Sequence, residues 1–256
     1  MTIDSHRLSE VFDDLLDGWV QSKGDHGPTL TDLRGRTEQQ IAAVMTMTAH
    51  AHATALVLRP VLPDGLTIAH MPLVRAVFEA TITAVWCDEV ADGANALINE
   101  GSRQRRNLRK ELGKTRSMAE MAEKINTGAG SLPTTSEQQA KRIEARCSEV
   151  SLDGAYAVYR MLSGLGHASI DTMDAYLDEG SFTPGHISIK SNSGPLDSSF
   201  AWAHLVASCL VWSGRVVDFL DPARSRRSAL QRAARALDIN DLLRVDYNAS
   251  ARGRNG

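Results

Sequence analysis

Two long segments of this chain are apolar on nearly every side, and they constrain its fold more than any other feature. Residues 71–87, MPLVRAVFEATITAVWC, carry only two charged side chains, and residues 198–220, SSFAWAHLVASCLVWSGRVVDFL, are almost wholly apolar. A helix that is apolar all round lies inside a protein core. The two segments therefore predict two central helices, with the rest of the chain packed around them.

The remaining chain shows helical patterns at three further places. Apolar residues recur with the helical period over residues 5–21, as in an amphipathic helix. The sequence TEQQ at 37–40 has the spacing of a capping box, so a second helix is expected to run from there to residue 58. A long basic helix is predicted over residues 94–125.

Residues 178–197 form the one stretch that does not look helical. HISIK within it alternates apolar and polar residues between Gly and Pro, which predicts a short hairpin or an ordered loop. We therefore predict an all-α protein, a single helical bundle over residues 1–256 with at most one short β-hairpin near 180–192. About two-thirds of the residues should be helical, against a usual third. Residues 223–256 are expected to form a basic C-terminal helix and a flexible tail.

Composition narrows the class of protein further. Aromatic residues make up only 5% of the chain while Ala and Leu dominate many segments, which favours closely packed helices over a β-sandwich. The net charge is −3, so bulk charge indicates no particular partner. Basic residues gather in segments 103–116 and 223–237. Each is expected to be a solvated helix face, unless the two lie side by side and form a nucleic-acid surface.

The cysteines and the hydropathy pattern give no sign of an oxidising compartment or a membrane. Cys87, Cys147 and Cys209 follow no disulfide or metal-site spacing. Cys87 and Cys209 lie in apolar runs, which is typical of core residues. No signal-peptide pattern and no apolar run of membrane length is recognised. A reduced, cytoplasmic protein without a membrane partner is therefore expected.

Arg75 and Glu79 are the two charged residues of the apolar segment 71–87. They stand four residues apart and share one face of a helix. Because a buried charge without a partner is costly, each must be satisfied there. Either the two form a salt bridge that holds the register of the bundle, or they line a polar pocket into which other helices also project.

A second polar pattern runs through residues 156–169. Four polar residues recur at the spacing of one helical stripe: Tyr156, Arg160, Ser163 and His167. Gly164 and Gly166 interrupt the segment, and glycine is unfavourable in a helix interior. One alternative is that the helix ends near Gly164 and leaves His167 as a cap or loop residue. The other is that the glycines permit the close approach of another backbone or a ligand.

Metal and cofactor chemistry have no support in these patterns. His50 and His52 stand two residues apart on a predicted helix and point in nearly opposite directions, so they cannot chelate one metal ion. GLGHAS at 164–169 resembles part of a dinucleotide fingerprint, but no strand precedes it. His204 lies in an apolar helix and is expected to be a core histidine. No metal and no cofactor is predicted.

Two of these segments together resemble a bacterial family of helical domains of unknown function. The family pattern combines R-x-x-x-E in one helix with Y-x-x-L-S-x-x-x-H further along the chain. The matching positions here are Arg75, Glu79, Tyr159, Leu162, Ser163 and His167. The resemblance covers residues 40–220 and implies an all-helical fold with no established activity. Together with the polar stripe, it predicts that Ser163 and His167 face inward or toward an interface, close to the helix at 71–87.

The chain also resembles the HEPN superfamily of helical bundles, found in toxin, antiphage and RNA-processing proteins. Active members carry an Arg and a His four to six residues apart near one helix. Six residues separate Arg160 from His167, which just fits that spacing. The resemblance implies a homodimer that cleaves RNA without metal. His167 would be the general acid or base, and Arg160 would hold the phosphate charge. Segments 103–116 and 223–237 would bind RNA. Met161 follows Arg160, where active members usually have a polar residue.

The sequence therefore leaves two functional hypotheses and a structural one. The preferred hypothesis is a non-catalytic module that binds a small ligand or a protein partner through a polar site made of Arg75, Glu79, Tyr159, Ser163 and His167. The alternative is a HEPN-like, metal-independent endoribonuclease of a toxin or antiphage system, with Arg160 and His167 as catalytic residues. In the structural reading, all of these residues serve packing or capping. An enzyme is neither predicted nor excluded.

Overall fold

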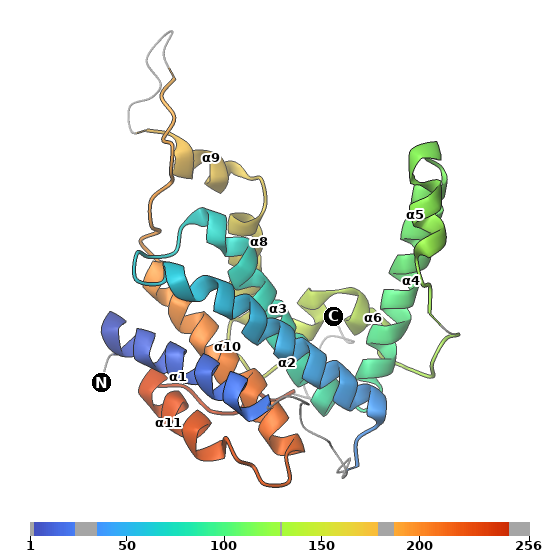
Figure 1. Cartoon of the computed structure of the whole chain (residues 1–256), viewed down its shortest axis with the longest axis horizontal. Coiled ribbons are helices and arrows are strands. Elements are labelled where there is room, and N and C mark those ends of the chain that lie inside the picture. Colours follow the sequence, from blue (N-terminus) through green and yellow to red (C-terminus); the bar gives the residue numbers. More distant parts are fainter. Residues whose placement is uncertain (1–2, 24–34, 129, 179–186, 246–256) are drawn as a thin grey trace, which may run out of the picture.

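The protein is a helical bundle from which one helical arm projects (Figure 1). The computed structural model describes residues 3–23, 35–128, 130–178 and 187–245, of which 71% are helical, and no sheet is present among them. The helices are α1 (Ser5–Lys23), α2 (Glu38–Leu58), η1 (Arg59–Val61), η2 (Ile68–His70), α3 (Met71–Glu89), α4 (Gly93–Gly113), η3 (Arg116–Met118), α5 (Ala119–Lys124), α6 (Glu137–Lys141), α7 (Ile143–Glu149), α8 (Ala155–Gly166), α9 (Ile170–Tyr176), α10 (Ser199–Leu220) and α11 (Arg227–Leu237). The prediction of an all-α fold is confirmed.

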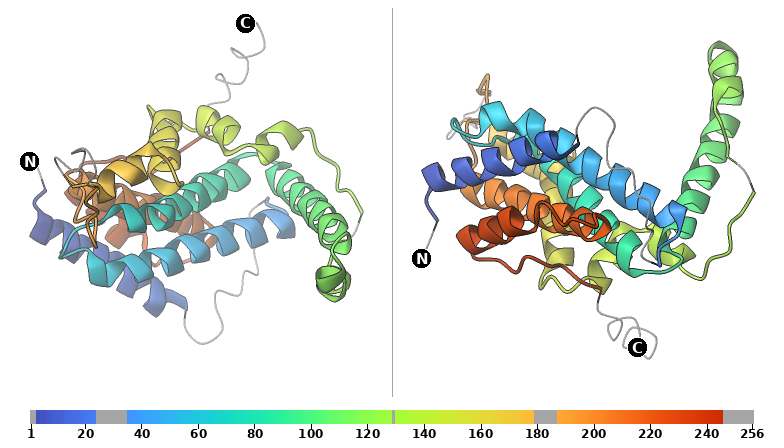
Figure 2. Two further views of the ribbon diagram at one scale, coloured as in Figure 1. Left: turned by 90° about the horizontal axis from the view of Figure 1, so that it is seen from above. Right: turned by 60° about the horizontal axis from the view of Figure 1, so that its bottom comes forward.

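The two segments predicted to be central form α3 and α10, which cross in the middle of the bundle (Figure 2). Helix α3 packs against α2, α10 and α8, and α10 also packs against α1 and α11. Phe78 and Trp86 of α3 have no exposed surface. Burial on all sides accounts for the apolar character of both helices.

The start of α2 follows the predicted capping box. Thr37 Oγ1 accepts a hydrogen bond from the Gln40 backbone N–H at 3.2 Å, and the Gln40 side chain accepts one from the Thr37 N–H at 3.0 Å. Both donors would otherwise have no partner within the helix. The sequence therefore predicted this helix boundary correctly.

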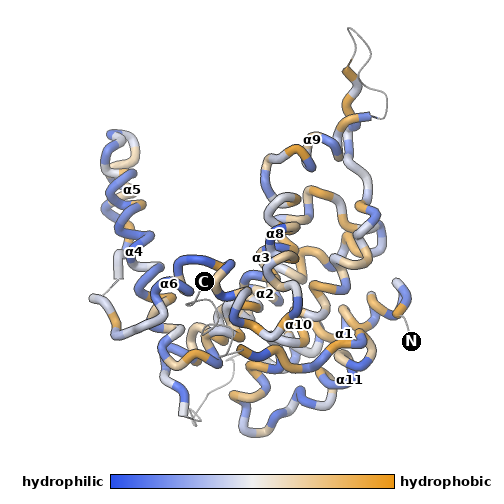
Figure 3. The backbone as a smooth tube through the Cα atoms, turned by 180° about the vertical axis from the view of Figure 1, so that it is seen from behind, coloured by the Kyte–Doolittle hydropathy of each residue, from blue (hydrophilic) through white to orange (hydrophobic). Residues whose placement is uncertain are grey.

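The basic helix predicted over 94–125 is broken in the structure. Helix α4 ends at Gly113, and a turn and η3 separate it from α5. The part of α4 beyond Ser102 is almost entirely exposed, so no tertiary contact compensates the poor helix propensity of Gly113. Figures 1 and 3 show α4 and α5 as a largely hydrophilic arm that leaves the bundle.

The non-helical stretch at 178–197 is described only in part. Leu177 and Ile189 form an isolated antiparallel bridge, and the Lys190 N–H donates to the Tyr176 carbonyl at 2.8 Å. The tip of the predicted hairpin, residues 179–186, lies outside the described residues. The two sides of the predicted feature therefore pair for a short distance.

Three helical stretches of the described chain are long and apolar enough to cross a membrane, judged by length and composition alone. They are Glu38–Val61, Ile68–Glu89 and Ser199–Leu220. The sequence analysis had recognised no apolar run of this length, and that reading was wrong. Each segment contains a few charged residues, so no uninterrupted apolar run is visible in the sequence. The mean hydropathy of each segment is nevertheless high enough for a membrane span.

Candidate functional site

Arg75 is the centre of a polar cluster between α3 and α8. Its Nε donates a hydrogen bond to Glu79 Oε1 at 2.6 Å, one turn along α3. On the α8 side, Arg75 Nη1 lies 2.5 Å from His167 Nε2, and Nη2 donates to Tyr159 Oη at 3.4 Å. The guanidinium also lies 5.3 Å from the centre of the Tyr159 ring. One side chain thus contacts three others and joins two helices.

His167 takes part in this cluster in one defined form. A guanidinium has no acceptor, so Arg75 must donate and His167 Nε2 must carry the lone pair. The ring proton of the neutral imidazole is then on Nδ1. His167 is the exposed C-cap of α8, and its carbonyl accepts from Thr172 Oγ1 at 2.8 Å. The cluster therefore holds one ring nitrogen and leaves the other without a described partner.

Helix α8 contains Gly164 but extends only two residues beyond it, and His167 is its C-cap, as in the alternative that the helix ends near Gly164 and leaves His167 as a cap. It ends at Gly166, and Ser169 Oγ donates to the Gly164 carbonyl at 2.8 Å, which satisfies a C-terminal carbonyl. A Cβ at Gly164 would lie 3.1 Å from the Asp171 carboxylate, which is tight. At Gly166 it would lie 3.8 Å from Pro72 of α3, an ordinary contact. The close approach is therefore to α9 rather than to α3.

A second guanidinium, that of Arg146 on α7, extends the cluster along α3. Arg146 Nη1 donates to Thr83 Oγ1 at 2.9 Å, and Thr83 Oγ1 donates to the Glu79 carbonyl at 2.7 Å. Burial lowers the pKa of Arg146, and its Nε is buried without a hydrogen-bond partner in the described chain. Sequence analysis missed Arg146 because the short segment around it is rich in charged residues, where an Arg is expected to be solvated.

The polar stripe of α8 does not all face inward. The buried face of this helix consists of Ala155, Tyr159 and Leu162. Tyr156 is 44% exposed, and Arg160 is exposed without an ion pair or side-chain hydrogen bond to any described residue. Ser163 is half-buried, and its hydroxyl has no described partner. The stripe is therefore divided: Tyr156 and Arg160 lie on the exposed side of α8, whereas Ser163 is partly buried.

The two basic segments do not form one surface. Residues 103–116 belong to α4 and the turn after it, whereas 223–237 precede and form α11. Figures 1 and 2 place α4 and α11 on different sides of the bundle. The two basic segments therefore do not lie side by side within one chain, which was the condition for a shared nucleic-acid surface.

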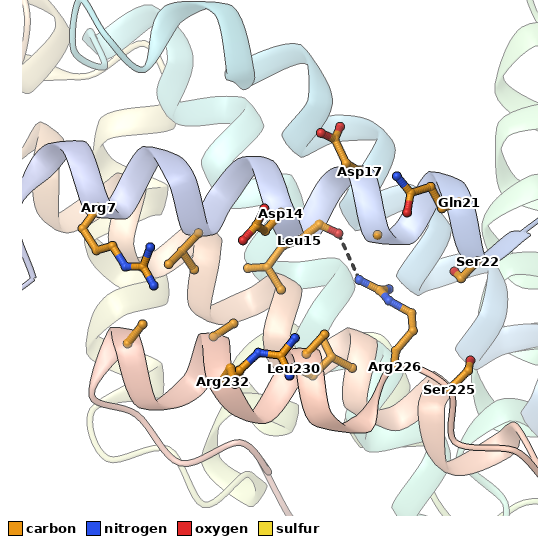
Figure 4. A pocket seen from close by; sticks show the side chains of 15 residues that line it. Arg7, Asp14, Leu15, Asp17, Gln21, Ser22, Ser225, Arg226, Leu230 and Arg232 are labelled. Atoms are coloured by element: carbon orange, nitrogen blue, oxygen red, sulfur yellow. Dashed lines mark hydrogen bonds between the residues drawn. The ribbon is translucent and has the colours of Figure 1, made fainter.

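A groove of about 640 Å³ lies elsewhere, between α1 and α11. Figure 4 shows Arg226 reaching from α11 to α1, where its Nη2 donates to the Leu15 carbonyl at 3.0 Å. Arg7, Arg232 and Asp14 also line the groove, so both signs of charge are present. Arg226 is partly buried, which lowers its pKa, and it bridges the groove. We therefore interpret the groove as the packing interface between α11 and α1.

The described residues contain no group of three or more His, Cys, Asp or Glu side chains arranged to hold a metal ion. Cys87, Cys147 and Cys209 are buried free thiols, and burial raises the pKa of each to about 12. A thiol with such a pKa is a poor nucleophile, because the thiolate is the reactive form. Cys87 and Cys209 are thus the core residues that were predicted, and Cys147 is buried as well.

Comparison with known proteins gives a family but no function. No curated protein and no solved structure matches this chain. One family model matches residues 43–184, which is more than half of the chain and includes Arg75, Glu79, Tyr159, Ser163 and His167. The match begins in α2, ends beyond α9 and excludes α10 and α11. The chain therefore belongs to DUF5677, a family of unknown function, which confirms the predicted membership of an uncharacterised helical family.

Proposed function

We propose that this chain is a non-catalytic helical binding module, and that it recognises its ligand through the polar cluster of Arg75, Glu79, Tyr159, Ser163 and His167. The observation that carries the proposal is the direct contact of Arg75 Nη1 with His167 Nε2 at 2.5 Å, while Arg160 stays outside the cluster. A residue held by a bond to another helix is pre-organised, which lowers the cost of binding.

The cluster supports binding because several of its hydrogen-bonding groups have no described partner and the cluster is partly exposed to solvent. Glu79 is 34% exposed at its side chain, and its Oε2 has no described partner. The Ser163 hydroxyl and the Nδ1–H of His167 are likewise without a described partner. These groups offer an acceptor and two donors, which suits a ligand that carries both a donor and an acceptor.

Ligand binding is tested by thermal shift with a collection of small polar metabolites. A compound that stabilises the parent should stabilise Glu79→Gln and His167→Ala less, because each variant removes a group offered to the ligand. Arg160→Ala is the matched control, since it alters an exposed residue of the same helix. Equal stabilisation of all three variants by every active compound would place the ligand elsewhere and reject this site.

The ribonuclease remains a second candidate, because Arg160, in the middle of α8, and His167, its C-cap, are both exposed. Against it, the imidazole nitrogen Nε2 is already occupied by Arg75. Incubating the protein with RNA in a chelator separates the two candidates. Cleavage that disappears in both Arg160→Ala and His167→Ala, with folding intact, would establish the ribonuclease. The binding module predicts no cleavage by the parent protein.

A ribonuclease of this kind also requires two protomers, whereas the binding site above lies within one chain. Light scattering therefore adds a second criterion. A monomer that binds a ligand at the cluster supports the module. A dimer that loses both RNA cleavage and dimerisation on substitution of the α8 surface supports the ribonuclease.

A further inference from the structure

An apolar cavity of about 480 Å³ lies on the other flank of α8. It has a wide mouth and lies between α8, α10 and the segment that follows α11. Its walls include Val158, Met161, Ala201, Trp202, His204 and Trp212. The cavity shares no residue with the polar cluster, although Val158 and Tyr159 are neighbours in α8.

The cavity wall contains no Asp, Glu, Lys or Arg, in a chain where these residues make up 23%. A site without any charge excludes ligands that need a counter-ion, because an unpaired charge is costly to move out of water. Its volume falls in the range of about 300–1,000 Å³ that is usual for small-molecule sites. Size and charge together therefore point to a small uncharged ligand.

The ring N–H groups that line the cavity already donate to protein acceptors. Trp202 Nε1 donates to Ser198 Oγ at 2.8 Å. Trp212 Nε1 donates to the Asn240 carbonyl, also at 2.8 Å. His204 Nε2 lies 2.9 Å from a backbone carbonyl, which can only accept, so this nitrogen carries the proton. The two indoles therefore have no donor left for a ligand, which leaves their ring faces as the contact surface.

The serine hydroxyls of the wall are also engaged. Ser208 Oγ donates to the His204 carbonyl at 2.8 Å, and Ser151 Oγ accepts from the Arg244 backbone N–H at 3.0 Å. At the mouth, Met161 is 53% exposed and Asn240 is exposed. The wall is thus mainly apolar, and its few polar groups include Asn240 and the hydroxyls of Ser151 and Ser198, which accept rather than donate in these hydrogen bonds.

We propose that this cavity is a second binding site, which takes an uncharged, mainly apolar small molecule with an aromatic or branched aliphatic body. The site is separate from the polar cluster and does not depend on the function proposed for it. The C-terminal residues 246–256, DYNASARGRNG, follow the cavity-lining segment in sequence, but they carry three charged side chains. That composition does not match a charge-free wall.

The test uses N-phenyl-1-naphthylamine, an uncharged apolar dye whose emission rises in an apolar site. Trp202 and Trp212 line the cavity, so bound dye should quench tryptophan emission by energy transfer. We expect saturable binding of one dye per chain to the full-length protein. Absence of saturable binding overturns the proposal, whether the cavity is closed or filled by another part of the chain.

Met161→Glu places a carboxylate at the cavity wall and should weaken dye binding by about tenfold or more, because the charge would be desolvated by the ligand. Met173→Glu is the matched control: Met173 is 59% exposed on α9 and does not line the cavity. Its affinity should equal that of the parent. Equal weakening by both substitutions overturns the proposal, since binding would then reflect general surface hydrophobicity.

Ala201→Trp gives an independent check, because Ala201 is exposed and a larger side chain there fills the cavity without adding charge. Dye binding should be lost while the circular dichroism spectrum and the melting temperature stay those of the parent. Unchanged dye binding in this variant rejects the site. A fall in molecular mass on Met161→Glu, measured by light scattering, would show that a second copy occupies the cavity and would also reject the proposal.

Discussion

The two central helices each carry an Arg–acid pair, and the two pairs differ in how they meet water. On α10, Arg215 Nη1 lies 2.7 Å from Asp218 Oδ2, and the two side chains are 3% and 1% exposed. On α3, the side chains of Arg75 and Glu79 are 20% and 34% exposed. A fully buried pair must recover its desolvation cost from other protein groups, whereas a partly exposed carboxylate can still accept from a ligand.

The surroundings of the α10 pair agree with a structural role. Asp218 Oδ1 accepts the backbone N–H of Arg226 at 3.1 Å, which fixes the start of α11. Arg215 Nε lies 3.0 Å from Asp241 Oδ2 as an ion pair without hydrogen-bond geometry. Burial raises the pKa of Asp218, and the charge of Arg215 opposes that shift. This pair ties α10 to the C-terminal segments, which lie outside the family match.

The largest effect should follow from breaking the buried pair. Arg215→Leu leaves Asp218 without its counter-charge and should lower the free energy of unfolding by about 3–5 kcal/mol. An acid with a raised pKa favours the fold in its protonated form, so the deficit should shrink as pH falls through that raised pKa. Urea unfolding of parent and variant at neutral and acidic pH measures this. A loss below 1 kcal/mol would contradict the burial.

At Asp92, in contrast to Asp218, hydrogen bonds outweigh burial, and the pKa of the carboxylate is lowered. Burial pushes its pKa up, but hydrogen bonds from Ser136, Thr135 and Thr134 outweigh burial and lower the pKa to about 2. Asp92→Asn should lower the free energy of unfolding by about 1.5 kcal/mol at neutral pH, after allowance for partial exposure. A lowered pKa contributes stability above the unfolded value of 3.8, and that contribution is lost as pH falls toward 2.

The same unfolding measurements across acidic pH check the sign. The difference between parent and Asp92→Asn should disappear between pH 3.8 and 2, the window set by the unfolded and folded pKa values. Asp88→Asn is not a suitable control, because Asp88 binds Arg36. Asp153→Asn is better, since Asp153 is exposed and has no described partner. A difference that grows on acidification would contradict the lowered pKa.

The two pairs also show which features of the structure could be predicted from the sequence. Arg75 and Glu79 stood out because they are the only charges in an apolar segment, and their spacing indicated a shared face. Arg215 and Asp218 carry the same signal, three residues apart in another apolar helix, yet the segment was described only as almost wholly apolar and the pair was not singled out. The pattern that found one pair could have found the other.

Other features depended on tertiary contacts that no local pattern contains. Gly164 has poor helix propensity, yet it lies inside α8, whose buried face packs on α3. Helices α8 and α4 both end at a glycine, Gly166 and Gly113. Sequence therefore predicted the fold class and the central helices, while helix ends and the position of Arg146 depended on which surfaces meet.

The α3 pair should respond less than the α10 pair, and the response should depend on whether one or both charges are removed. Glu79→Ala should cost about 1 kcal/mol, because it removes a charged hydrogen bond in a partly exposed place. Replacing Glu79 and Arg75 together by Leu and Met should cost less than the sum of the two single changes, since no unpaired charge remains. Thermal or urea unfolding of the four proteins gives the coupling energy. Additive losses would show that the two residues act independently.

The smallest effect should come from Arg160, and it decides how α8 is used. Arg160 is exposed and has no described partner, so Arg160→Ala should change the free energy of unfolding by less than about 0.5 kcal/mol. His167→Ala removes the acceptor of Arg75 Nη1 and should cost more, about 1 kcal/mol. Measured together, the two losses show whether the arginine and the histidine belong to one unit. A binding cluster built on Arg75 predicts unequal losses, because only His167 is part of it. Equal losses would mean that Arg160 and His167 share a local contact absent from this structure. Partial exposure would then no longer distinguish the Arg75–Glu79 pair of α3, as a binding site, from the buried structural pair of α10.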